Sequence, residues 1–248
     1  MKFRRSAGLG AVGLVTFLVA WELFARSADS ALVPPPSAIP AALVSEIENG
    51  FWYRMVLASF GHYAIGFLIG SSLGVLCGVT VALLPTVAAL QGGLVRVLRP
   101  IPPLAWTPFA IIWFGISESA AAFLISIGIF WINYFAALTA VQSVDKDLLE
   151  VARAFGHSST LGQLVKVVVP AASPGILGGL RTGLGQGWMT VVAAELFGIA
   201  GIGQRMMEAS GLLATDVVVL YMLTIGGLYA LTDYVFVAIQ RRVLAWQK

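Results

Sequence analysis

The sequence predicts an all-α membrane protein with six transmembrane helices, on the basis of its composition, its apolar runs and the placement of its basic residues. Of 248 residues, 58% are apolar and only 11% are charged, with a mean hydropathy of +0.89. Soluble domains carry about 25% charged residues, so the chain is an integral membrane protein, expected to form one bundle over residues 1–248. The expected spans are residues 7–25, 56–84, 101–116, 120–141, 176–199 and 217–239.

The first apolar run follows a basic N-terminus, MKFRR, and is about long enough to cross a bilayer core of ~30 Å. A cleaved signal peptide is the alternative, because residues 25–31 offer small side chains to a protease. We expect a retained span, since the run is long for a signal core. Residues 29–54 then predict an outer loop with an interfacial helix that Ser37 caps and that continues through Glu48.

The second span has a glycine on one face at every fourth position. Glycine lowers helix stability, but in a membrane it lets another helix approach closely. We therefore interpret this face as a helix-packing seam. Its members are Gly66, Gly70, Gly74 and Gly78.

Residues 87–99 are expected to form a cytoplasmic connection, followed by the proline-rich run RPIPPLAWTPF at the start of the third span. Prolines are tolerated at a helix entrance, where the first amides have no partner. Pro108 is expected to kink this span, and broken helices of this kind often line transport paths.

The distribution of lysine and arginine predicts the orientation. With six spans and both termini in the cytoplasm, twelve basic residues are cytoplasmic and three are outside, in agreement with the positive-inside rule. The outer three are Arg26, Arg54 and Arg205. Residues 145–175 are therefore a cytoplasmic loop.

This loop is the longest polar interval and contains a short predicted helix. Asp145 or Asp147 is suited to cap its start, and an apolar stripe continues to Phe155. Gly156 is expected to end it. A second helical run over residues 161–169 should be broken by Pro170 and Pro174.

The same residues resemble a known family. Glu150-Val151-Ala152 followed by Gly156 is similar to the "EAA" loop of bacterial ABC-importer permease subunits, and the sequence beyond resembles permeases for sulfonates, taurine, nitrate or bicarbonate. The further matching stretches are Pro174-Gly175-Ile176, Gly179-Leu180-Arg181, Gly185, Trp188 and Val192-Ala193-Ala194-Glu195-Leu196. The resemblance extends from Val33 to the C-terminus. Val151 stands where the family usually has alanine, the interval from Gly156 to Pro170 is one residue longer, and Gly187 replaces a polar residue.

The resemblance implies a type I ABC-importer permease fold in a bacterial inner membrane. It also implies a homodimer, two cytoplasmic ATPase subunits that bind ATP and Mg²⁺, and an extracytoplasmic substrate-binding protein. The short loop helix would then be the coupling helix that docks on an ATPase; for an arbitrary protein, its charged residues would indicate only a solvated face. Its expected docking residues are Leu149, Glu150, Val151, Ala152, Arg153, Phe155 and Gly156.

Glu195 lies late in the fifth span, where an ionisable group is costly and usually faces a cavity or a partner. We expect it to hold an outer gate rather than to contact an anionic substrate; a position at the outer headgroup level is the alternative. Gln186, Trp188 and Thr190 are candidate pathway residues, with packing inside the bundle an equal alternative.

Other chemistry has little support in the sequence. His62 and His157 are too far apart to suggest a metal site, the lone Cys77 cannot form an internal disulfide, and no phosphate-binding G-x-x-x-x-G-K-[ST] motif or basic nucleic-acid patch occurs. We therefore expect no catalytic residues, no metal and no cofactor in this chain. An intramembrane enzyme would need paired catalytic residues, and a secondary transporter would show an internal repeat.

The substrate is predicted from the resemblance alone. The stretches RPIPPLAW and LATDVVV favour taurine or an aliphatic sulfonate. Nitrate, bicarbonate, aromatic acids and vitamin precursors are the alternatives.

Overall fold

The structure, a computed structural model, describes residues 2–27, 32–155 and 159–247. Every regular element within these ranges is helical, and the predicted all-α class is confirmed. The longer elements are α1 (Lys2–Ser27), α2 (Ile39–Glu48), α3 (Phe51–Leu83), α4 (Pro85–Leu98), α5 (Thr107–Phe114), α6 (Glu118–Gln142), α7 (Lys146–Ala154), α9 (Val169–Glu195), α10 (Ile202–Gly211) and α11 (Thr215–Val243). The shorter ones are η1 (Pro36–Ala38), η2 (Pro103–Trp106), α8 (Thr160–Gln163), η3 (Leu164–Val168) and η4 (Ala245–Gln247).

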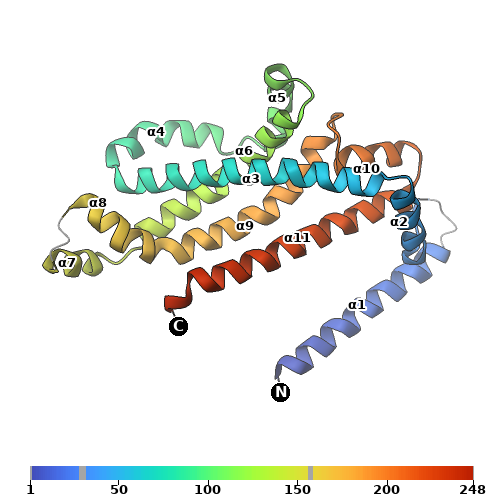
Figure 1. Cartoon of the computed structure of the whole chain (residues 1–248), viewed down its shortest axis with the longest axis horizontal. Helices are drawn as coiled ribbons and strands as arrows, with labels where there is room; N and C mark the ends of the chain where they lie inside the picture. Colours follow the sequence, from blue (N-terminus) through green and yellow to red (C-terminus); the bar gives the residue numbers. More distant parts are fainter. Residues whose placement is uncertain (1, 28–31, 156–158, 248) are drawn as a thin grey trace.

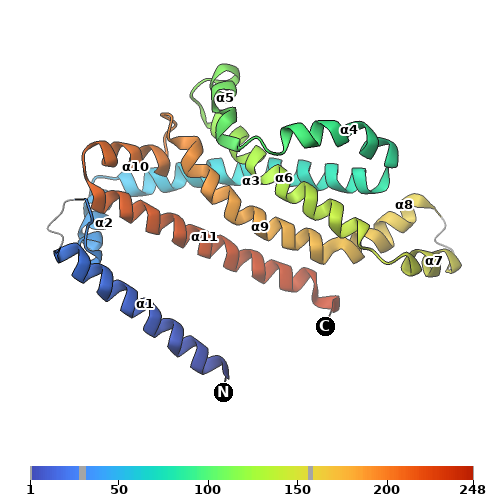
Figure 2. The same ribbon diagram turned by 180° about the vertical axis from the view of Figure 1, so that it is seen from behind.

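Helices α3, α6 and α9 form the centre of the bundle, and α11 packs along α9 (Figure 1). Helix α1 diverges from the others and joins them only near its C-terminal end (Figures 1 and 2), where Trp21 packs against α2 and α11. Within the described ranges, four helices are long and apolar enough to cross a membrane: α3, α6, the run Leu164–Glu195, and α11.

The four glycines of the predicted seam lie against α6. A Cβ atom on Gly70 would lie 2.5 Å from the Ser126 carbonyl oxygen, and one on Gly74 would lie 2.6 Å from that of Phe130. Atoms at optimal contact are about 3.5–4.0 Å apart, so no larger residue fits without separating the helices. The glycine face sets the close approach of α3 and α6.

Residues 85–98 form helix α4 rather than the connecting segment that the sequence predicted. After the turn at Leu84, α4 runs back beside α3 (Figures 1 and 2). Leu98, at its end, lines a cavity of about 410 Å³ with Ile69 and Leu73, close to the middle of α3. Pro108 lies in the first turn of α5, where its missing amide costs little. The predicted kink at Pro108 was therefore wrong, because the break in the chain lies earlier, between α4 and η2.

The prediction that Pro170 and Pro174 break the helix was also wrong. Elements α8, η3 and α9 follow one another directly, with a π-helical segment at η3. Pro170 occupies the first turn of α9. Pro174 cannot donate to the Pro170 carbonyl, but the Ser173 hydroxyl donates to that oxygen at 2.8 Å. This bond replaces the missing backbone bond, so the helix continues.

Ser37 does not cap α2, which begins at Ile39 without a side-chain cap. Its hydroxyl instead donates to Glu22 Oε1 at 2.8 Å, and its amide donates to Glu22 Oε2 at 3.1 Å. The predicted cap was wrong because Ser37 lies inside η1, so Ala38 and not Ser37 occupies the N-cap position of α2. These two hydrogen bonds fix the C-terminal part of α1 to η1.

Candidate functional site

Helix α7 begins as the sequence predicted. Asp145 is its N-cap, and the carboxylate accepts a hydrogen bond from the Asp147 amide at 3.0 Å. The helix ends at Ala154, with Phe155 as the C-cap residue. Gly156, the expected stop, lies outside the described residues. Figures 1 and 2 place α7 at one extreme of the molecule, beyond the turn between α3 and α4.

The inner face of α7 holds it against the bundle. Ala152 is buried, and Leu149 packs against a cluster of Val141, Val168 and Ala172. Leu149 also lines a cavity of about 440 Å³, together with the C-terminal end of α3 and with residues 163–168 of α8 and η3. The helix is therefore anchored on the bundle by its inner face, although its two ends are joined to loops.

The outer face of α7 is apolar and exposed. Leu148, Val151 and Phe155 follow one another at helical spacing, and Phe155 is 79% exposed. Glu150 and Arg153 are also exposed beside them. An exposed apolar patch with charges at its rim is a surface suited to contact another protein.

Glu195 is fully buried at the end of α9, among polar groups from α3 and α10. It accepts hydrogen bonds from the Ser59 hydroxyl at 2.8 Å and from the Gly203 amide at 2.9 Å. His62 Nδ1 lies 2.8 Å from its other oxygen. The Ser59 oxygen in turn accepts from the Ile202 amide at 2.8 Å. The carboxylate thus joins the start of α10 to α3 and α9.

Sequence reasoning placed Glu195 at a functional position but did not identify His62 as its partner. The two residues are separated by 133 positions, and no local pattern connects them. The available signal was physical: an ionisable group in a span requires a partner, and His62 is the one basic residue in the expected second span, residues 56–84.

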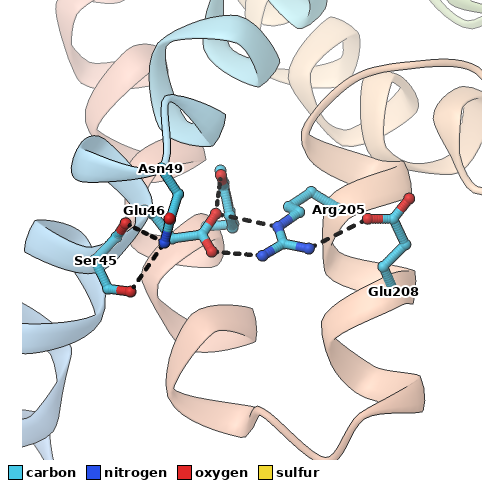
Figure 3. A network of polar contacts seen from close by, with 6 residues as sticks. Ser45, Glu46, Asn49, Arg205 and Glu208 are labelled. Carbon is cyan, nitrogen blue, oxygen red and sulfur yellow. Dashed lines mark hydrogen bonds and ion pairs between the residues drawn. The ribbon is translucent and has the colours of Figure 1, made fainter.

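A second polar network joins α2, α10 and α11 (Figure 3). Helices α2 and α10 lie at the end of the molecule opposite α7 (Figure 1). Arg205 donates to both oxygens of Glu46, at 2.6 and 3.1 Å, and Tyr221 donates to Glu46 at 2.8 Å. Arg205 also contacts Glu208 at 3.3 Å and lies 4.3 Å from the centre of the Phe51 ring. The sequence contained no signal for this network.

Glu46 and Arg205 form an oppositely charged pair within this network. Burial alone would raise the pKa of Glu46, but the hydrogen bonds from Arg205 and Tyr221 outweigh it and hold the pKa below its usual value. The hydrogen bond to Glu46 raises the pKa of Arg205, despite the opposing effect of burial. Both groups are therefore charged, and the pair fastens α2 to α10.

The remaining candidate pathway residues lie within the bundle. The Trp188 ring stacks on Tyr63 with centroids 4.3 Å apart, and its indole N–H donates to Thr232 on α11 at 3.2 Å. Thr190 is buried and donates to the Gln186 carbonyl at 2.9 Å. Trp188 therefore fills the space between α3 and α11 in the isolated chain.

The fold and these sites define a polytopic helical membrane protein with a short helix at one end whose apolar outer face is exposed. Residues 70–245 match the family model described as binding-protein-dependent transport system inner membrane component. The chain belongs to this family. It is a permease subunit of an ABC importer, a transport component rather than an enzyme.

Several relatives have similar lengths. A putative ABC transporter permease of Methanocaldococcus jannaschii is 34% identical, covering 93% of this chain and 89% of its own. The taurine transport system permease protein of Escherichia coli is 34% identical (87% and 80%), and the bicarbonate transport system permease protein of Synechococcus elongatus is 31% identical (94% and 87%).

Solved structures confirm the fold class. A chain of the MetNI methionine ABC transporter in an inward-facing conformation matches with a TM-score of 0.69 at 20% identity, covering 80% of this chain and 98% of that chain. This similarity supports the type I ABC-importer permease fold.

Proposed function

We propose that this permease imports a small anion, with taurine or another aliphatic sulfonate as the first candidate substrate. The similarity to the taurine permease of Escherichia coli and to a putative aliphatic sulfonates permease of Bacillus subtilis, 32% identical, supports this choice. Nitrate, bicarbonate, aromatic acids and vitamin precursors are the alternatives. Among them, the similarity to a bicarbonate permease favours bicarbonate.

The proposed assembly is a homodimer of this chain with two cytoplasmic ATPases and an extracytoplasmic binding protein. Both termini lie in the cytoplasm of a bacterial cell, and the chain crosses the inner membrane six times. Helix α1 and the broken pair α4 and α5 supply the two crossings beyond the four long helices. The excess of basic residues at the α7 end supports this orientation.

The observation that carries the proposal is the two-faced helix α7. Its inner face is fixed to the bundle, and its outer face presents Leu148, Val151 and Phe155 to solvent. A helix held in this way can transmit a push from an attached ATPase to α6 and α9. Burying a phenylalanine side chain contributes roughly 1.5–3 kcal/mol, so Phe155 alone would account for a substantial part of the attachment.

Glu195 supports the proposed outer gate. It holds the first amides of α10 against α3 and α9 at the end of the bundle opposite α7. Relative movement of α3 and α9 would therefore strain these hydrogen bonds, so the network resists opening at that end.

Co-purification of the ATPase with Phe155→Asp tests the coupling role. We expect at least a tenfold loss of bound ATPase, which corresponds to about 1.4 kcal/mol. Leu212→Asp is the matched control, because Leu212 is as exposed as Phe155 but is the C-cap residue of α10, the helix at the end opposite α7 (Figure 1). Wild-type recovery of the ATPase with Phe155→Asp would reject α7 as the docking element.

A further inference from the structure

Two arginines lie at the break between α4 and η2. Arg96 is in the last turn of α4 and Arg99 is its C-cap residue. They are three positions apart, so they project from the same side of the helix. Both are exposed in the isolated chain. In the sequence they suggested a cytoplasmic connection, but α4 runs back beside α3 and carries them along it (Figure 1).

The depth of these arginines follows from their neighbours. The Arg99 guanidinium lies 4.2 Å from the centre of the Phe135 ring, inside α6. The adjacent Leu98 shares a cavity with Ile69 and Leu73, which lie at least ten residues, or roughly 15 Å, from the end of α3. Arg99 therefore lies beside a membrane-spanning helix, about 10 Å along α6 from its end at Gln142, and Arg96 lies one turn earlier on α4.

No carboxylate neutralises this pair among the described residues. The ion pairs recorded there involve neither Arg96 nor Arg99. Glu195 and Asp233, the carboxylates deepest in the spans, are already bonded to His62 and Arg181. Charged side chains at membrane depth face a water-filled cavity or a partner, so an exposed, unpaired arginine pair requires one.

The backbone beside the arginines gives an independent indication. Between α4 and η2 the chain is not helical, Pro102 is extended, and Pro100 and Pro102 are exposed. Irregular backbone at membrane depth is tolerated only where it is buried in protein or lines an aqueous cavity. Interrupted helices of this kind border substrate pathways in transporters.

A cavity borders the Phe135 ring against which Arg99 lies. It has a volume of about 600 Å³ and is lined by Phe135, Thr139 and Ser143 of α6 and by the start of α9. Phe135, on which Arg99 rests, forms one end of it, and the hydroxyl-bearing residues follow in the next two turns. Phe135 thus borders both the Arg99 guanidinium and a partly polar groove, although neither arginine lines the groove itself.

We propose that Arg96 and Arg99 form a binding site for a small oxyanion, the sulfonate, carboxylate or nitrate group of the transported substrate. Guanidinium groups match two oxygens of such a group with paired hydrogen bonds. A bound anion also relieves the repulsion between two like charges one turn apart. The inference rests on the proposed import of an anion. In a homodimer the second copy would bring two more arginines to the pathway.

Cysteine reactivity tests the site without transport. In a Cys77→Ser background, Gly93→Cys places a thiol one turn before Arg96, at a position with room for a side chain. We expect an anionic methanethiosulfonate reagent to react at least tenfold faster than a cationic one, and taurine or inorganic sulfate to slow it. Adding Arg96→Gln and Arg99→Gln should remove the preference. An unreactive thiol, or equal rates for the two reagents, would overturn the proposal.

Taurine uptake into proteoliposomes containing the complete transporter is the second test. Arg99→Gln should lower uptake at least tenfold, Arg99→Lys should retain part of it, and Arg54→Gln, at the outer end of α3, should leave it unchanged. Wild-type uptake by the Arg96→Gln/Arg99→Gln variant would refute the site. An effect that follows the fraction of anionic lipid would also refute it, because it would assign the arginines to lipid headgroups.

The two tests separate this inference from the proposed substrate. If the wild-type protein carries no taurine, the substrate assignment fails, but the preference for an anionic reagent at position 93 still reports the arginine site. If taurine is carried and the preference is absent, the site fails while the importer assignment stands.

Discussion

Substitution of Gly70 by alanine gives the most direct test of the helix seam. The added Cβ would lie 2.5 Å from the Ser126 carbonyl oxygen and 2.9 Å from its Cα. Because these are backbone atoms, no rotamer change relieves the contact, and α3 and α6 must separate by roughly 1 Å to reach an ordinary distance. Such overpacking typically costs about 1–3 kcal/mol. The gain in helix propensity from alanine recovers at most about 1 kcal/mol.

Gly61→Ala is the matched control, because it lies on the same helix with nothing within 4 Å of the new methyl group. Both variants would be unfolded by SDS titration in mild detergent, with helix content as the readout. We expect Gly61→Ala to keep or slightly increase stability, and Gly70→Ala to be about 1–3 kcal/mol less stable than Gly61→Ala. Equal stability of the two variants would refute the seam.

Two further predictions concern the polar networks. Glu195→Ala leaves the Ser59 hydroxyl and the Gly203 amide without their acceptor, which costs about 1–3 kcal/mol for each buried donor. We therefore expect faster hydrogen exchange of the α10 amides in this variant. Unchanged exchange would contradict the role of Glu195. The lowered pKa of Glu46 means that its contribution to stability is present above the unfolded value, about 4.3, and is lost as the pH falls through the folded value. Acid should therefore loosen α2 from α10 in the wild type, with a smaller response in Glu46→Gln, as measured by hydrogen exchange; an identical response would contradict the assignment.

Features set by local sequence patterns were predictable. Glycines at every fourth position fix one helix face, and the structure places that face against α6. Asp145 precedes an amphipathic segment, and it caps α7. In both cases a few neighbouring residues determine the geometry, so tertiary contacts had little to alter.

Features that depend on long-range contacts were not predictable. Pro174 remains inside a helix because the Ser173 hydroxyl donates to the Pro170 carbonyl, which the proline cannot do. The positions of the prolines in the sequence do not reveal this hydrogen bond. Arg96 and Arg99 have the sequence appearance of a cytoplasmic connection, yet the turn at Leu84 directs α4 back along α3. The partner of Glu195 comes from a distant segment, so only the folded chain reveals it.

ATP hydrolysis by the assembled transporter tests the central claim most directly. The chain and its ATPase would be co-purified into lipid nanodiscs, and binding protein loaded with taurine, another sulfonate, nitrate or bicarbonate would be added in turn. We expect stimulation by a sulfonate-loaded binding protein, and its loss in Phe155→Asp. Failure of the chain to associate with any ABC ATPase would contradict its assignment as an importer permease.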